Sequence, residues 1–226
     1  MTSLTIGISG VAGAGKDTFA AILASLLEKR GYSVQRFALA GELKEEVADF
    51  SCKHYGIDPL TCSREEKELI RPLLITHGCL KRRTSKGRYW VEKLNDKILE
   101  WNSSPNRVSI ITDIRFSDFE ADETHWLQEE LKGVLVHLSL YLSLFETGSN
   151  PSRDFFREFK KPNNAEEERN DPILLNKANY KCEWEQREGS QEYILQELIP
   201  YVEQFITWLI EHHRLNANPE NKGDKL

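Results

Sequence analysis

The chain has 226 residues, and its 30 lysines and arginines stand against 36 aspartates and glutamates, which gives a net charge of −6. This acidic balance argues against a groove for nucleic-acid polymers as the main function, because phosphate backbones require clustered positive charge. The length and the 39% of hydrophobic residues suit one α/β domain.

No stretch reaches the roughly 18 consecutive apolar residues that a membrane-spanning helix needs. Met1–Ser9 lacks a basic region followed by an apolar signal core. The cysteines lack the close pairing of a zinc or redox motif; they are Cys52, Cys62, Cys79 and Cys182. We therefore expect reduced thiols in a cytoplasmic protein with no membrane partner.

The N-terminal part predicts a strand, a glycine-rich turn and a helix. The apolar run Leu4–Ser9 precedes GVAGAGKDT, and a helical pattern extends from Lys16 to Arg30. Glycines allow backbone N–H groups to approach an anion, and a helix start adds unpaired N–H groups and a positive dipole end. The spacing G-x-x-x-x-G-K is typical of loops that bind nucleoside triphosphates. The predicted phosphate-binding residues are Gly10, Gly13, Ala14, Gly15, Lys16, Asp17 and Thr18.

Asp17 occupies the position at which a serine or threonine usually holds magnesium in such loops. Two alternatives follow from this substitution. The Asp17 carboxylate reaches the metal itself or through water, or Thr18 supplies a hydroxyl one position later. We favour Thr18.

The next part of the chain alternates between strand and helix patterns. The expected elements are a strand at Ser33–Leu39, helices near Glu42–Tyr55, Arg64–Arg83 and Tyr89–Trp101, a strand at Arg107–Thr112, a helix at Ser117–Lys132 and a strand at Val134–Leu140. This alternation predicts a three-layer α/β fold with a parallel, doubly wound sheet. The helical region at about 40–101 is the expected acceptor-binding part.

The segment Tyr141–Asn176 breaks the pattern, because it is polar and charged, with a short helical piece expected near Asp154–Lys160. We expect a lid insertion here, at about 141–176. A last strand at Tyr180–Trp184 and an amphipathic helix at Gln191–His213 complete a domain of residues 1–213. That helix packs either on the sheet or on a second copy of the chain, which leaves a homodimer open. Residues 214–226 are expected to form a solvated tail.

A second group of chemical residues follows the buried strand at Arg107–Thr112. An acid such as Asp113, at the carboxyl end of a strand beside the phosphate loop, is placed to position magnesium or water. Arg115 would face the same crevice and clamp a phosphate bidentately. The alternatives are that Asp113 caps the next helix and that Arg115 forms a surface ion pair.

Other basic residues are candidates for phosphate contacts. Those between residues 71 and 88 form either an acceptor-phosphate pocket or a solvated helix face; they are Arg71, Lys81, Arg82, Arg83, Lys86 and Arg88. Arginines in the expected lid would stabilise charge on a transferred phosphoryl group, and the candidates are Arg153, Arg157 and Arg169.

Several segments, taken together, resemble those of phage-type deoxynucleoside monophosphate kinases, within the P-loop nucleotide-kinase superfamily. They are GKDT (15–18), FALAGELKEEV (37–47), RPLLITHGCLKRR (71–83), YWVEKL (89–94), ITDIRFSDFEAD (111–122), GVLVHLSLY (133–141) and AEEERNDPILLNKANYKCE (165–183). The chain departs from the family pattern at Ile75, Cys79 and Leu80, where the family has glutamine, threonine and an acid.

The resemblance implies phosphoryl transfer from ATP, with Mg²⁺, to a nucleoside monophosphate. Lys16, Asp113 and Arg115 would be catalytic, and Thr18, Asp17 or Asp113 would serve the metal. The acceptor nucleotide would contact Leu39, Ala40, Lys44, Arg71, Arg82 and Arg115.

Two rival hypotheses remain at this point. One is a P-loop kinase for another small acceptor, such as phosphomevalonate or dephospho-coenzyme A. The other is a catalytically degenerate nucleotide-binding module, which the departures at Ile75, Cys79 and Leu80 motivate. Fold alone does not choose among them.

Overall fold

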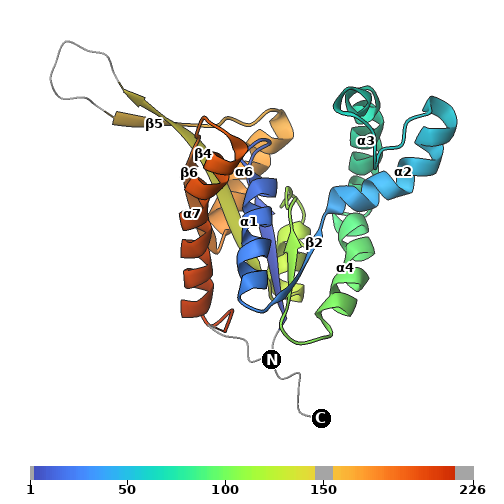
Figure 1. Ribbon diagram of the computed structural model, residues 1–226. Coiled ribbons are helices and arrows are strands. Elements are labelled where there is room, and N and C mark those ends of the chain that lie inside the picture. Colours follow the sequence, from blue (N-terminus) through green and yellow to red (C-terminus); the bar gives the residue numbers. More distant parts are fainter. Residues whose placement is uncertain (1–2, 146–154, 217–226) are drawn as a thin grey trace.

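A mostly parallel sheet forms the centre of the molecule (Figure 1). The computed structural model describes residues 3–145 and 155–216. Its strands are β1 (Leu4–Ser9), β2 (Ser33–Phe37), β3 (Arg107–Ile111), β4 (Val134–Phe145), β5 (Phe155–Phe159) and β6 (Tyr180–Glu185). The strand order is β2-β3-β1-β4, and both β5 and β6 pair with β4. Among the described strands, only β5 runs antiparallel to its neighbour, so the predicted α/β class with a mostly parallel sheet is confirmed.

Helices cover both faces of the sheet. On one face lie α1 (Lys16–Lys29) and α7 (Gln191–Glu211). On the other lie α4 (Arg88–Asn102), the short α5 (Glu123–His125) with the π-helical turn η1 (Trp126–Glu130), and α6 (Ala165–Lys177). The helix α7 therefore packs on the sheet, which is one of the two expected options. The helices α2 (Leu39–Tyr55) and α3 (Arg64–Thr84) extend to one side as an arm (Figure 1).

Side chains alternate between the two faces of β1, and this alternation determines how the helices on each face pack against the sheet. Leu4, Ile6 and Ile8 are buried on the face that packs against α1 and α7. Gly7 lies on the opposite face, where a Cβ atom would overlap the side chain of Leu127 and come within 2.9 Å of Ile114. A glycine at this position lets η1 pack directly against the central strand.

The arm has a small core and an ionic network of its own. Apolar contacts among Val47, Ile70 and Leu74 join α2 to α3. The Glu46 carboxylate accepts hydrogen bonds from His77 (2.8 Å) and from the Tyr89 hydroxyl (2.6 Å). It also forms ion pairs with Lys81 and Lys93. Glu46 thereby links α2 to both α3 and α4.

Two expectations from the sequence are wrong in this part of the chain. The helix expected at Ser117–Lys132 begins only at Glu123, because the N–H groups of Asp118 and Phe119 donate to the Asp122 carboxylate and form a turn there. The helical piece expected near Asp154–Lys160 is strand β5 in its described part, because it pairs with an extension of β4. That pairing is non-local, and the local residue pattern does not reveal it.

Smaller differences appear at the ends of elements. The second residue of the tail expected at 214–226 is packed, since Leu215 is buried. Asn216 exchanges hydrogen bonds with the Tyr32 hydroxyl, at 2.8 and 3.0 Å. The four cysteines are free thiols. Within the described ranges, none of the helices combines the length and the apolar character needed to cross a bilayer.

The Glu46 network predicts an acid-dependent stability. Partial desolvation alone would raise the pKa of Glu46, but hydrogen bonds from Lys93, Tyr89 and His77 lower it to about 2, below the ordinary value of 4.5. Ionised Glu46 therefore stabilises the fold at pH values above about 4.5, and this contribution is lost as the pH falls towards about 2. Glu46→Gln should flatten the dependence of Tm on pH across this acidic range.

The matched control is Glu45→Gln, because Glu45 is exposed and its one ion pair in the described structure, with Lys97, is long at 3.4 Å. Thermal unfolding followed by circular dichroism measures both variants. Identical acid profiles for the two variants would show that the Glu46 network does not stabilise the arm.

Candidate active site

The glycine-rich loop joins β1 to α1 at the carboxyl end of the central strand. Gly10, Gly13 and Gly15 have positive φ angles of 134°, 77° and 87°. Gly15 is also the N-cap of α1, and its left-handed conformation provides no side-chain cap for the helix. The N–H groups of the first turn of α1 are therefore left to bind an anion, which the helix dipole also favours.

Trp184 on β6 supports this loop from the side. Its indole Nε1 donates to the carbonyl of Ala14 at 2.9 Å, and its ring lies edge-on to Phe19, with 5.7 Å between ring centroids. A Cβ atom at Gly15 would overlap the indole ring. Sequence reasoning missed this residue, because 170 positions separate Trp184 from Ala14 and no local pattern connects them.

Lys16 folds back over the loop. Its Nζ donates to the carbonyls of Gly10 (2.7 Å) and Val11 (2.9 Å). Burial lowers the pKa of Lys16, and the charge of Arg115 lowers it further, while Glu167 on α6 opposes the shift. Lys16 and Arg115 are thus close enough to influence each other, which agrees with the predicted grouping of these two cations.

Asp113 caps a helix, but this helix is α2, which precedes it in the chain, and not the next helix that the alternative named. Its two carboxylate oxygens accept hydrogen bonds from the N–H groups of Leu39 (2.8 Å) and Ala40 (2.7 Å). Desolvation raises the pKa of this buried carboxyl, against the effect of the two N–H groups and of Arg115. The predicted acceptor-site residues Leu39 and Ala40 therefore direct these N–H groups to Asp113.

Arg115 is exposed, and in the described residues it takes part in no ion pair. Its backbone N–H and that of Phe116 both donate to Glu123 Oε2, at 2.7 and 3.0 Å. Glu123 is buried, and burial together with the neighbouring Asp122 raises its pKa to about 8. Glu123 thus holds the backbone of Arg115, whose cationic side chain has no acidic partner in the described structure. The sequence pattern did not indicate this contact with Glu123.

Arg82 does not fit its predicted role as an acceptor-phosphate ligand. It is buried, forms ion pairs with Asp118 (3.0 Å) and Asp122, and stacks on Phe116 with 3.9 Å between guanidinium carbon and ring centroid. These contacts make Arg82 a structural link between α3 and the loop that precedes α5. The density of basic residues in the sequence could not reveal this internal pairing.

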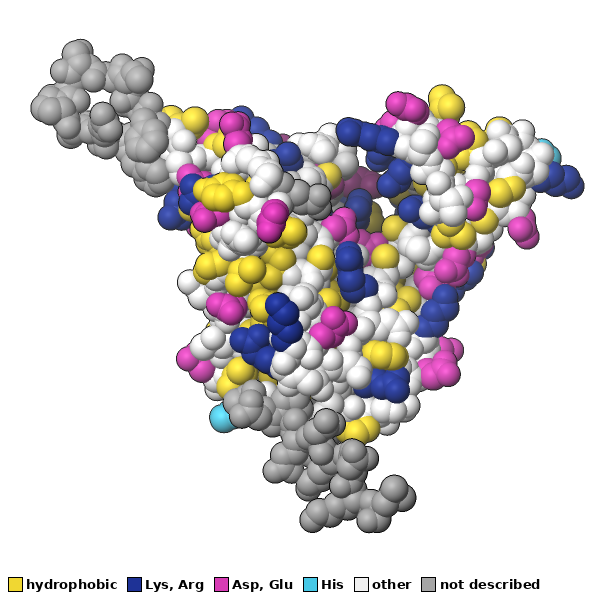
Figure 2. Space-filling view, viewed as in Figure 1, with side chains coloured by type: hydrophobic (Ala, Val, Ile, Leu, Met, Phe, Trp, Pro, Cys, Tyr) yellow, Lys and Arg dark blue, Asp and Glu magenta, His cyan; other side chains and the backbone are white. Residues whose placement is uncertain are grey.

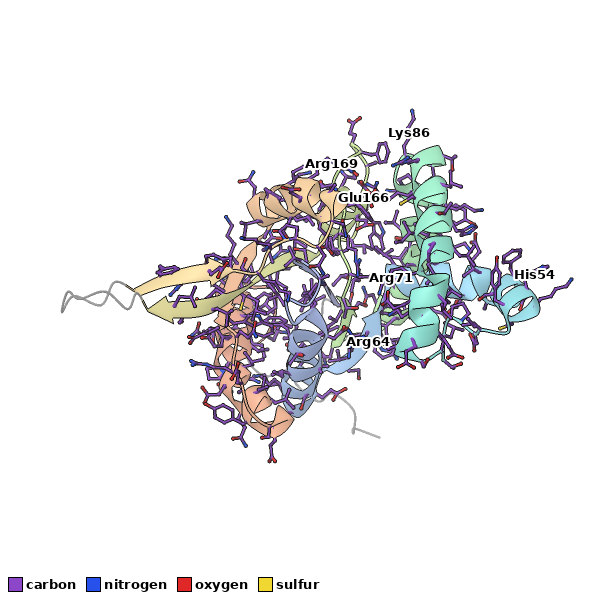
Figure 3. The ribbon with its side chains drawn as sticks, turned by 90° about the horizontal axis from the view of Figure 1, so that it is seen from above. His54, Arg64, Arg71, Lys86, Glu166 and Arg169 are labelled. Carbon is purple, nitrogen blue, oxygen red and sulfur yellow. The ribbon has the colours of Figure 1, made fainter. Side chains whose placement is uncertain are left out.

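Other predicted residues lie on the arm. Arg71 is exposed on α3 and pairs with Glu68 (Nε to Oε2, 2.7 Å). Figure 3 places Arg71 on the side of α3 that faces α1. Glu42 on α2 pairs with Lys97 of α4. Lys44 follows two residues later, which places it about 200° around the helix from Glu42. Lys44 therefore faces away from α4.

The predicted lid arginines are engaged elsewhere or lie outside the described residues. Arg157 pairs with Glu183 (2.9 Å) and lies over the Tyr141 ring. Arg169 donates two hydrogen bonds to Asp118, both of 3.1 Å. Arg153 falls in the range that the structure does not describe. The two described arginines are thus committed to carboxylates rather than directed at the loop.

The metal candidates differ in their surroundings. Asp17 is exposed and pairs with Arg36 of β2 at 2.9 Å. Thr18 is half-buried on the first turn of α1. In the described part of the chain, no three histidine, cysteine or acidic side chains form a metal-binding group. Mg²⁺ is commonly held by one or two protein ligands together with substrate phosphates and water. Thr18 and Asp17 are the residues of the loop that could supply such a ligand.

A buried histidine connects the strand before the loop to α6. His137 Nδ1 lies 3.0 Å from Ser9 Oγ, and its Nε2 lies 3.6 Å from Asp171 Oδ1. Burial and the charges of Lys16 and Lys181 lower the pKa of His137 to about 4, so it is neutral near pH 7. Sequence reasoning assigned this histidine no role, and its pairing again spans distant segments.

A hollow lies between the arm and the main body; lysine and arginine side chains gather on its wall near α3, and aspartate or glutamate side chains lie in it as well (Figure 2). A separate cavity of about 650 Å³ lies at the β2 edge and is lined by residues such as Arg36, Phe37, Lys97 and Trp101. That cavity contains no residue of the loop. The hollow of Figure 2 is therefore the better candidate site.

Comparisons with known proteins leave the chain without an assigned family. No family model matches it, and neither does any curated protein. Two of the solved structures that match the chain align with most of its length. The crystal structure of TT1252 from Thermus thermophilus is 15% identical, with a TM-score of 0.39, and the match covers 91% of this chain and 99% of that one. The crystal structure of APE1195 is 17% identical, with a TM-score of 0.35 and coverages of 91% and 97%. Such low similarity identifies neither a shared fold nor a function.

Because Trp184 packs on Gly15, adding one methyl group at Gly15 should lower the free energy of unfolding substantially. Gly15→Ala places a Cβ in a left-handed conformation and against the indole, which should cost about 2–4 kcal/mol in the free energy of unfolding. Gly41→Ala is the matched control, because Gly41 lies in α2 with its nearest neighbour at 4.0 Å. It should instead stabilise the protein by about 0.5–1 kcal/mol.

Urea-induced unfolding measures both changes. Equal free energies for Gly15→Ala and the unmodified protein would contradict the described packing of the loop.

Proposed function

We propose that this protein is an ATP-dependent kinase of the P-loop type that converts a nucleoside or deoxynucleoside monophosphate to its diphosphate. One observation carries the proposal. A glycine-rich loop with uncapped helix N–H groups, the ammonium of Lys16 and the exposed guanidinium of Arg115 come together at the carboxyl ends of adjacent parallel strands. Open α/β sheets bind their ligands at this edge.

The loop would hold the donor phosphates. Its N–H groups and the start of α1 would bind the phosphate oxygens, and Lys16 would exchange its two carbonyl contacts for contacts with those oxygens. Thr18 would hold the magnesium ion, since Asp17 is paired with Arg36. The metal, when bound, supplies charge neutralisation on the donor phosphates.

The acceptor would enter the hollow between the loop and the arm. Arg115 would bind its phosphate, supported by the Glu123 anchor of its backbone. On the arm, Arg71 and Lys44 are the candidates for further contacts with the acceptor. A monophosphate oxygen is already an anion, so no general base is needed. Catalysis then consists of alignment and charge stabilisation.

The test is an ATP-consumption assay with magnesium against the common ribo- and deoxynucleoside monophosphates. Arg115→Ala should lower kcat/KM by about 10²–10³, and Lys16→Ala by at least as much, because each removes a charge that acts in the transition state. Lys29→Ala, at the opposite end of the same helix, should change nothing.

Each other outcome selects a different conclusion. Unchanged turnover in Arg115→Ala would exclude the clamp. Turnover only with other acceptors, such as phosphomevalonate or dephospho-coenzyme A, would replace the nucleotide acceptor. ATP binding without any turnover would favour a binding module, and the absence of ATP binding would refute the proposal.

A further inference from the structure

The β4–β5 hairpin brings the chain back to the glycine-rich loop. Strand β4 lies beside β1, and a Cβ atom at Gly10 would overlap the carbonyl of Leu138. Two residues further along β4, the Leu140 carbonyl accepts a hydrogen bond from the N–H of Lys160, at 2.8 Å. Lys160 directly follows β5, so strand pairing fixes its backbone beside the loop.

The Lys160 side chain lies across Gly13. Its Cε is 2.9 Å and its Nζ 3.2 Å from the position that a Cβ atom of Gly13 would take. Gly13 also has a φ of 77°, which disfavours any other residue. The ammonium of Lys160 is therefore held against the same loop over which Lys16 folds from within.

The charges around Lys160 distinguish it from its basic neighbours. Arg157 pairs with Glu183 and Arg169 with Asp118. The adjacent Lys161 pairs with Glu158, at 3.9 Å. Among the described residues, no ion pair involves Lys160.

Lys16 and Arg115 likewise form no ion pair within residues 3–145 and 155–216. Lys160 and Lys16 thus lie at the loop and Arg115 near it, without an ion-paired acid in the described structure. The charges of Glu167, Asp17 and Asp113 also act on Lys16. Lys16 and Arg115 repel each other, and a polyanion bound beside them relieves this repulsion.

We propose that Lys160 is a phosphate-contacting residue, whose ammonium binds the polyphosphate of the donor nucleotide from the hairpin side of the loop. This inference rests on the proposed function, because it requires a triphosphate in the loop. Lys160 would then make the phosphate contact that the sequence analysis expected of a lid arginine. It also gives Gly13 a second reason to be glycine, since a side chain there would displace the lysine.

The test compares Lys160→Met with Lys161→Met by isothermal titration calorimetry. The two lysines are adjacent and exposed, so both variants should keep the Tm of the unmodified protein. We expect Lys160→Met to raise the Kd of ATP about 10-fold, which corresponds to about 1.4 kcal/mol. Lys161→Met should leave the Kd unchanged, and Lys160→Arg should restore most of the affinity.

Inorganic tripolyphosphate is the second probe, and it identifies the part of the nucleotide that Lys160 contacts. Its Kd should rise in Lys160→Met by a factor similar to that for ATP. A weaker affinity for ATP with an unchanged affinity for tripolyphosphate would overturn the inference, because Lys160 would then contact the nucleoside.

Failure of the inference differs from failure of the proposed function. Equal Kd values for Lys160→Met and Lys161→Met, in a protein that binds ATP, would refute the role of Lys160 alone. An unmodified protein that binds neither ATP nor tripolyphosphate would refute both proposals.

Discussion

The carboxylate of Asp113 is the contact on which the arrangement of the site depends. Its oxygens bind the first N–H groups of α2 and so connect the end of β3 to the arm. The contact satisfies helix N–H groups that are otherwise unpaired, and the positive end of the helix dipole adds to it. Together with the Glu46 network and the Glu42–Lys97 ion pair, this buried carboxylate sets the direction of α2 and with it the hollow between arm and sheet.

Around the candidate site, several carboxylates form structural hydrogen bonds or ion pairs, whereas several cations form no ion pair in the described residues. Asp113 caps α2, Glu123 holds the backbone of Arg115, and Asp122 binds Arg82. Lys16 and Arg115 lie close enough for their charges to interact, and neither forms an ion pair in the described residues. This pairing explains how a protein with a net charge of −6 can keep cations without ion-paired acids beside the loop.

The sequence predicted those features whose signal is local. The loop, α1 and the parallel class of the sheet follow from glycine spacing, apolar periodicity and the alternation of elements. The contacts that complete the site were not predictable in this way, because Trp184, Lys160 and Arg82 act on residues distant in the chain. The helix expected at Ser117–Lys132 starts late for a related reason, since the Asp122 side chain forms a turn where the pattern indicated a helix.

The indole of Trp184 gives the molecule an optical property of its own. Indole emission depends on the polarity and motion of its surroundings, and this ring touches the loop at Gly15. The other tryptophans lie on α4, η1 and α7; they are Trp90, Trp101, Trp126 and Trp208. A chain that retains tryptophan only at position 184 would therefore carry a native fluorophore whose emission follows the state of the loop in solution.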